Sequence, residues 1–145
     1  MKNAFLIIAF IFCHKFLFAQ QNKSIDYQYS REEGKYFAFE LLIDDNFKTN
    51  KKLLINFATN SAFEKLGKIT LLSGKEELKL KFKPREESIK SDNPELKFYP
   101  VTVDWNVLKQ SQLGCEAQII FKSDKGDAYA LPFNLCKISE LLDKD

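Results

Sequence analysis

The sequence predicts an all-β protein, a single antiparallel immunoglobulin-like β-sandwich of about seven to nine strands. Three observations predict it. Apolar residues recur at every second position along most of the chain. Turn-forming residues separate these segments at short intervals. No segment carries apolar residues at helical spacing for long enough to form a long helix. A small lipocalin-like β-barrel is the alternative, because the same strand pattern can close on itself.

The first predicted strands follow one another with different patterns. Residues 25–30 alternate, which places Ile25, Tyr27 and Tyr29 on the core face. Residues 36–43 form a more continuous apolar run, typical of a strand that is covered on both faces. Alternation returns in residues 53–57, and it is clearest in residues 77–83, after a turn at Ser73-Gly74.

Residues 95–105, 114–123 and 127–136 complete the set of predicted strands. In the first of these, Leu96 and Phe98 share one parity and Val101, Val103 and Trp105 share the other. A β-bulge at Pro100 would cause this switch, and proline lacks the N–H group that a central ladder needs. We therefore expect a kinked strand, at an edge or crossing between sheets. Two separate strands that meet at a turn are the alternative.

Two short segments favour a helix. Residues 61–67 begin with Ser61, which is followed three positions later by Glu64, and end at Gly67. This is a capping box closed by a glycine, and it predicts one helical turn. The tail at 139–142 is the second candidate.

The N-terminus is typical of a secretory signal peptide over residues 1–20, followed by one domain over residues 21–145. A lysine precedes an apolar run, and His14-Lys15 ends that run before it could span a bilayer. We expect cleavage after Ala19 or Gln20. Lipid attachment at Cys13 is not expected, because large residues stand just before it.

Removal of this leader changes what the chain can do. Lys2 and Lys15 leave with it, so 20 basic residues remain against 20 acidic ones, and the net charge falls to zero. A neutral domain lacks the basic patch that nucleic acid requires. His14 is the only histidine, so its loss excludes histidine catalysis and histidine zinc sites. We therefore expect no metal, no cofactor and no enzyme activity. A hydrolase that uses two carboxylates is the remaining catalytic alternative.

Cys115 and Cys136 lie near the ends of a predicted hairpin that turns at residues 124–126. Two cysteines in an exported domain are usually bonded, so we predict a disulfide, with a reactive thiol pair as the alternative. A three-residue loop pairs apolar residues with one another: Phe121 with Tyr129, Ile119 with Leu131 and Ala117 with Phe133. That register sets Cys115 opposite Leu135. A slip of one residue near Pro132 would bring the two cysteines together, and a two-residue loop would pair them directly.

The candidate contact region comprises two rings and three charged residues of a long loop: Tyr99, Trp105, Arg85, Glu86 and Glu87. Aromatic rings can stack on sugars or anchor a protein partner, although most of the tyrosines fit the core parity of their strands. Tyr99 is out of phase with Phe98, which makes it the best candidate for an exposed ring. Residues 84–94 form the longest segment without predicted structure, and long loops on sandwiches often bind partners.

Lysines 79, 81 and 83 form a basic stripe on one strand face. We interpret the stripe as a solvated face that discourages edge pairing; an acidic ligand such as an anionic polysaccharide is the alternative. Together these features predict an exported, non-enzymatic binding module of the periplasm or cell exterior, whose partner is an envelope protein or a glycan. A lipocalin-like carrier of an apolar ligand is the alternative function.

Overall fold

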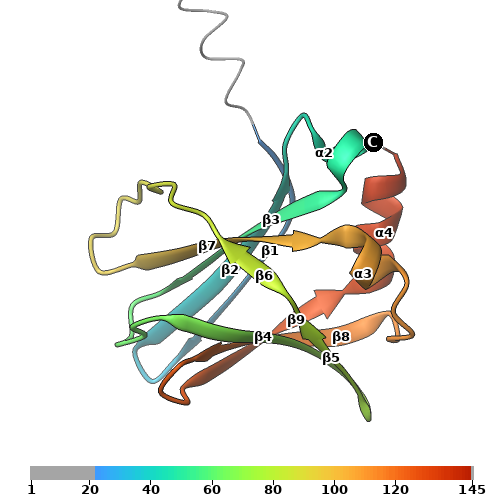
Figure 1. The fold of residues 1–145 in the computed structure, drawn as a ribbon. Coiled ribbons are helices and arrows are strands. Elements are labelled where there is room, and N and C mark those ends of the chain that lie inside the picture. Colours follow the sequence, from blue (N-terminus) through green and yellow to red (C-terminus); the bar gives the residue numbers. More distant parts are fainter. Residues whose placement is uncertain (1–21, 145) are drawn as a thin grey trace, which may run out of the picture.

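The computed structural model describes residues 22–144, and two antiparallel sheets form the fold (Figure 1). In order across the five-stranded sheet lie β1 (Lys23–Glu32), β2 (Lys35–Ile43), β3 (Lys52–Thr59), β7 (Lys97–Asp104) and β6 (Phe82–Pro84). The four-stranded sheet is ordered β5 (Glu76–Leu80), β4 (Leu66–Ser73), β8 (Glu116–Ser123) and β9 (Ala128–Asn134). The leader 1–20, with Cys13 and His14, lies outside the described residues.

The two sheets pack face to face around an aromatic core. Phe39 and Phe57 of the five-stranded sheet contact Phe121 of the other sheet, with ring centroids 5.9 and 4.3 Å apart. All three side chains are fully buried. The sandwich prediction is thus confirmed. The barrel alternative is wrong, because the strands form two separate sheets that do not close.

The hairpin of β8 and β9 has the predicted register. The three predicted pairs are all present: Phe121 with Tyr129, Ile119 with Leu131 and Ala117 with Phe133. Gly126 occupies the turn with φ of +103°, a conformation that favours glycine. Local turn chemistry and apolar pairing are sufficient to set this part of the fold.

The predicted strand 77–83 is in fact two strands in different sheets. β5 ends at Leu80 in the four-stranded sheet, and β6 begins at Phe82 in the five-stranded sheet. Lys81 is therefore the point where the chain crosses between sheets. Leu80 is buried and Phe82 packs against the core, so both keep the inward orientation that the alternation predicted.

The predicted bulge at Pro100 is wrong. β7 pairs with β3 in one unshifted register, in which Pro100 lies opposite Asn56. The carbonyl of Pro100 accepts a hydrogen bond from Arg85 N at 2.9 Å, just beyond the end of β6. In an antiparallel strand the N and C=O of one residue point to the same side, so the nitrogen of Pro100, like its carbonyl, points away from β3. On that side β6 has already ended at Pro84, so no ladder hydrogen bond needs the N–H that proline lacks. The proline therefore costs the β3 ladder nothing.

The predicted helical turn at residues 61–67 is also wrong. Residues 61–65 have neither helix nor strand, and β4 already begins at Leu66. Phe63 explains this outcome, because its fully buried ring packs edge-on against Phe57. The Ser61 hydroxyl does not cap a helix; it hydrogen-bonds the Tyr129 hydroxyl at 2.6 Å.

Three short helices lie at one end of the sandwich (Figure 1). They are α2 (Phe47–Asn50), α3 (Trp105–Lys109) and α4 (Leu135–Asp143). Each contributes side chains to the core, among them Phe47, Leu108 and Ile138. The predicted tail helix exists, but it begins four residues earlier than expected, immediately after β9.

Candidate functional site

A β-bulge near the start of β1 determines which rings reach the surface. The pairing of β1 with β2 shifts between Ser24 and Asp26, and such a bulge reverses the parity of the strand. Ile25 therefore points into the core, whereas Tyr27 and Tyr29 point outward and are 50% and 65% exposed. The prediction that Tyr27 and Tyr29 fill the core is wrong for this reason.

Three tyrosines from β1 and β2 cluster on this outer surface, and we call Tyr27, Tyr29 and Tyr36 the tyrosine face. The ring of Tyr29 lies 6.1 Å from that of Tyr27 and 6.2 Å from that of Tyr36, the latter pair stacked. The hydroxyls of Tyr27 and Tyr36 share a hydrogen bond of 2.5 Å. Burial, and then this hydrogen bond, raise the pKa of Tyr27 to about 12. The three rings therefore contact one another, and a hydrogen bond joins two of them.

A strip of polar groups continues from the tyrosine face across the same sheet. Glu40 lies opposite Tyr27, and Asn56 lies opposite Glu40 on the next strand. Arg85 donates from its guanidinium to the Asn56 side chain. Because strands are spaced about 4.8 Å apart, Asn56 lies roughly 10 Å from the β1 backbone. Aromatic surface and hydrogen-bonding groups thus adjoin one another on a rigid sheet.

Part of the predicted contact region lies on the outer face of this sheet, and the rest does not. Arg85 belongs to the polar strip through its bond to Asn56 on β3, and burial lowers its pKa. Glu87 accepts from Arg85 at 3.0 Å, and Glu86 is exposed beside it. Residues 85–94 of the predicted loop contain neither helix nor strand. Pro84 instead belongs to β6, and the strand predicted to begin at residue 95 begins at Lys97.

The two predicted rings of that region lie elsewhere. Tyr99 is not an exposed ring: it is half-buried, and its ring packs against Phe57 and Phe63 at 6.0 and 5.1 Å. Trp105 is only 3% exposed and begins α3. Since the register of β7 is unshifted, Tyr99 shares the inward parity of Val101 and Phe98 faces outward. Sequence reasoning missed Tyr27 and Tyr29 because no residue type marks the bulge in β1.

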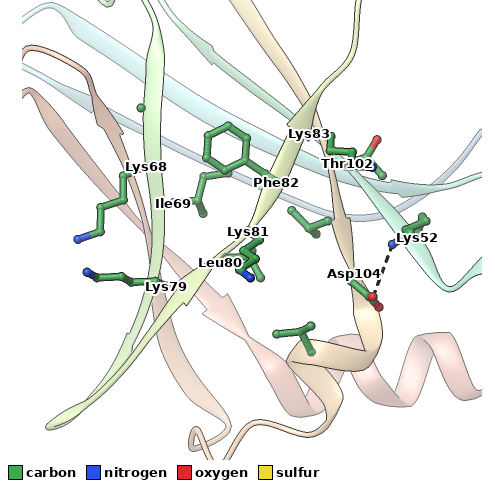
Figure 2. Close-up of a pocket in the computed structure, with 13 residues that line it drawn as sticks. Lys52, Lys68, Ile69, Lys79, Leu80, Lys81, Phe82, Lys83, Thr102 and Asp104 are labelled. Carbon is green, nitrogen blue, oxygen red and sulfur yellow. Dashed lines mark hydrogen bonds and ion pairs between the residues drawn. The ribbon is translucent and has the colours of Figure 1, made fainter.

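The predicted lysine stripe lines a groove of about 890 Å³ at the open edges of the two sheets (Figure 2). Lys52 and Lys68 join Lys79, Lys81 and Lys83 around it. Asp104 is the one carboxylate among the described residues that line the groove, and it pairs with Lys52 at 3.5 Å. The carboxylate pair that a hydrolase would need does not lie here.

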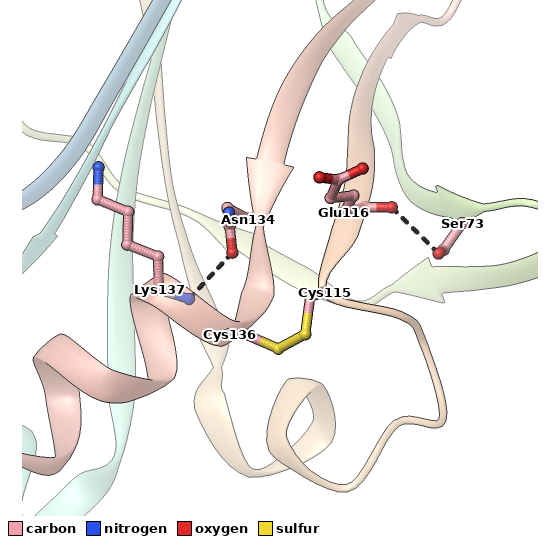
Figure 3. Close-up of a disulfide and its surroundings, with 6 residues drawn as sticks. All are labelled: Ser73, Cys115, Glu116, Asn134, Cys136 and Lys137. Atoms are coloured by element: carbon pink, nitrogen blue, oxygen red, sulfur yellow. Dashed lines mark hydrogen bonds between the residues drawn. A yellow bond between two sulfur atoms is a disulfide. The ribbon is translucent and has the colours of Figure 1, made fainter.

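The predicted disulfide between Cys115 and Cys136 is present, with the two Cα atoms 4.9 Å apart (Figure 3). The predicted slip near Pro132 is wrong, because β8 and β9 pair without a shift and Gln118 lies opposite Pro132. Both cysteines are exposed. The bond therefore lies at the surface, at the end of the hairpin.

Helix α4, and not a slip in the strand register, brings the two cysteines together. The Asn134 side chain caps the helix by accepting from Lys137 N at 3.0 Å (Figure 3), which is the preferred role of asparagine at this position. Leu135 N donates to the Cys115 carbonyl at 2.8 Å. The first helical turn thus brings Cys136 back to Cys115.

Among residues 22–144 no helix is long and apolar enough to cross a membrane; the longest, α4, has nine residues. The same part of the chain contains no group of three or more histidine, cysteine, aspartate or glutamate side chains placed to hold a metal ion. Comparison of the chain with protein-family models, with curated proteins and with solved structures finds no match in any of the three.

Proposed function

We propose that this chain is an exported, non-catalytic binding module that holds a glycan on its tyrosine face. The observation that carries the proposal is the exposure of Tyr27 and Tyr29, at 50% and 65%, on an otherwise ordered sheet. A contiguous exposed apolar patch on an ordered surface is typical of an interaction site. Aromatic rings present an apolar face that suits the C–H face of a sugar ring.

The polar strip supplies the second part of sugar recognition. Hydroxyl groups need both donors and acceptors, and Glu40 and Asn56 offer these beside the rings. Arg85 holds the Asn56 side chain in place, which reduces the entropy lost on binding. Arg31 lies over the Tyr36 ring, 6.0 Å from its centroid, and adds further donors beside the rings, which suits the hydroxyl groups of a glycan.

A glycan array followed by titration calorimetry tests the proposal. Wild-type protein is expected to bind at least one neutral oligosaccharide, and Tyr29→Ala to weaken that binding at least tenfold, about 1.4 kcal/mol. Tyr29→Trp should retain binding, since it keeps a flat ring. Lys122→Ala, an exposed change on the outer face of the other sheet, is the matched control and should leave binding unchanged. Capture of a protein in place of any glycan, with the same dependence on Tyr29, would favour the protein partner.

Export is the second component of the proposal. It rests on the leader-like pattern of residues 1–20 and on a disulfide that persists in oxidising compartments. N-terminal sequencing of the protein recovered from the producing cell is the test. Export predicts a first residue of Gln20 or Gln21, whereas a chain that retains Met1 would contradict it.

A further inference from the structure

The groove beneath the lysines combines an apolar floor with a cationic rim. Ile69, Leu80 and Val103 form the floor and are buried parts of the core. Phe82 and Val107 extend this apolar surface toward solvent; Phe82 is half-buried and Val107 is 43% exposed. In Figure 2 the ring of Phe82 points from its strand toward β4, over the floor. Phe82 and Val107 therefore offer a ligand exposed apolar surface, above a floor of core residues.

The rim of the groove carries an excess of positive charge, whereas the chain as a whole is nearly balanced. Five lysines face one carboxylate at this groove, whereas the whole chain carries 22 basic and 20 acidic residues. Within residues 22–144, no carboxylate pairs with Lys68, Lys79, Lys81 or Lys83. Figure 2 shows the side chains of Lys68 and Lys79 extending to the same side. Like charges gathered in this way favour an anion between them.

The size and the two surfaces together restrict the ligand. A volume of about 890 Å³ lies within the range of small-molecule sites. An anionic polysaccharide would leave the apolar floor unused, and a neutral apolar ligand would leave the lysines without counter-charge. A molecule with an alkyl chain and a terminal anion uses both surfaces. We propose that the groove binds a fatty-acid carboxylate, with its chain along the apolar surface and its head group beside Lys68 and Lys79.

Titration calorimetry with monomeric laurate, below the concentration at which it aggregates, tests this proposal on the mature chain. Laurate is expected to bind about fourfold more tightly for each methylene that it has beyond decanoate, the effect of burying one CH₂ group. Its methyl ester should bind at least tenfold more weakly than laurate, because it lacks the charge. No binding of laurate, or equal binding of acid and ester, would overturn the proposal.

Two pairs of variants locate the site. The double charge reversal Lys68→Glu/Lys79→Glu should weaken laurate binding at least tenfold. Lys97→Glu/Lys122→Glu, which alters the net charge equally at exposed positions of β7 and β8 outside the groove, should not. Val107→Asp should also weaken binding, since it places a carboxylate beside the floor, and an unchanged circular dichroism spectrum will show that it folds. Equal losses in both pairs would contradict a site in the groove.

Vesicle sedimentation distinguishes a single bound fatty acid from a membrane surface. Vesicles that contain an anionic phospholipid should bind the protein no better than neutral vesicles do. If the protein binds the anionic vesicles and monomeric laurate does not bind, the lysines serve a lipid surface and the proposal is wrong. Tyr29→Ala should leave laurate binding unchanged, so failure here and failure of glycan binding are separate results.

Discussion

Two aromatic clusters occupy opposite faces of the same five-stranded sheet. The inner cluster lies between the sheets and includes Phe57, whose ring stacks on Phe121 at 4.3 Å and 12°. The outer cluster is the tyrosine face, where rings also contact one another, at 6.1 and 6.2 Å. The inner rings have a second sheet above them, whereas Tyr27 and Tyr29 are at least half exposed.

The difference shows that strand register, and not residue type, decides what an aromatic ring does in this molecule. Tyr99 and Tyr129 have the same side chain as Tyr29, yet both pack against the core. An inner ring contributes to stability through the apolar area it buries. Truncation of an outer ring should cost the protein little stability, and the ring remains available to contact a partner. The comparison therefore makes opposite predictions for stability and for binding.

The largest expected effect is on the inner side. Phe57→Ala should lower the free energy of unfolding by about 3–5 kcal/mol, because it removes a fully buried ring and leaves a cavity. Tyr29→Ala should change it by no more than about 0.5 kcal/mol. Urea denaturation of both variants measures the difference. Similar losses in the two would show that the outer rings are part of the stabilising core.

The disulfide offers the next largest effect. Replacing Cys115 and Cys136 with serine should lower stability by about 3 kcal/mol, the loop-closure entropy for residues separated by 21 positions. The loss arises in the unfolded chain, which the bond no longer constrains, so Leu135, Ile138 and Leu142 of α4 should keep their places in the core. Thermal unfolding with and without reductant measures it. At temperatures where the double variant remains folded, binding at the tyrosine face should be unchanged.

Local chemistry made one part of the fold predictable from the sequence. The β8–β9 hairpin was predicted pair by pair, since a glycine turn and neighbouring apolar residues contain all the necessary information. Partial success came at the cysteines: the bond was predicted, but the backbone path to it was not. Cys136 reaches Cys115 through the first turn of α4, which the single Asn134 cap helps to start.

Features that depend on distant strands were not predictable. The bulge in β1 became meaningful only through pairing with β2, and it reversed the orientation of Tyr27 and Tyr29. Pro100 looked like a break because nothing in its own strand reveals that β6 ends beside it. The lysine groove was not predictable because two of its lysines, Lys52 and Lys68, lie on strands distant in sequence from the stripe. In each case the missing information was the identity of the neighbouring strand.

A smaller effect separates the two clusters by their hydroxyl groups. Tyr129→Phe should lower stability by about 1 kcal/mol, because it breaks the hydrogen bond of 2.6 Å to Ser61 and leaves the serine with a weaker set of partners. Tyr29→Phe, which alters an exposed ring in the same way, should have no measurable effect. Urea denaturation of the two variants makes the comparison, and an equal loss would contradict the inner assignment of Tyr129.

The smallest effect concerns the alkaline behaviour of the tyrosine face. The pKa of Tyr27 is raised from 10.0 to about 12, by burial first and then by the hydrogen bond to Tyr36. Between these two values the unfolded chain loses the phenolic proton while the folded chain retains it. The unfolded state then binds fewer protons, so stability is complete below pH 10 and falls as the pH rises toward 12.

Tyr36→Phe tests that account, because it removes the hydrogen bond and leaves the ring in place. The pKa of Tyr27 should move back toward 10.0, and the loss of stability that its titration causes should span a narrower pH range. Ultraviolet titration of the phenol groups measures the shift, with Tyr129→Phe, which removes a phenol on the other sheet, as the control. Because Tyr27 is 50% exposed, solvent screens its interactions and the change in stability should be slight. If the titration of Tyr27 is unchanged in Tyr36→Phe, the hydrogen bond to Tyr36 does not contribute to its raised pKa, and this account of the outer cluster is wrong.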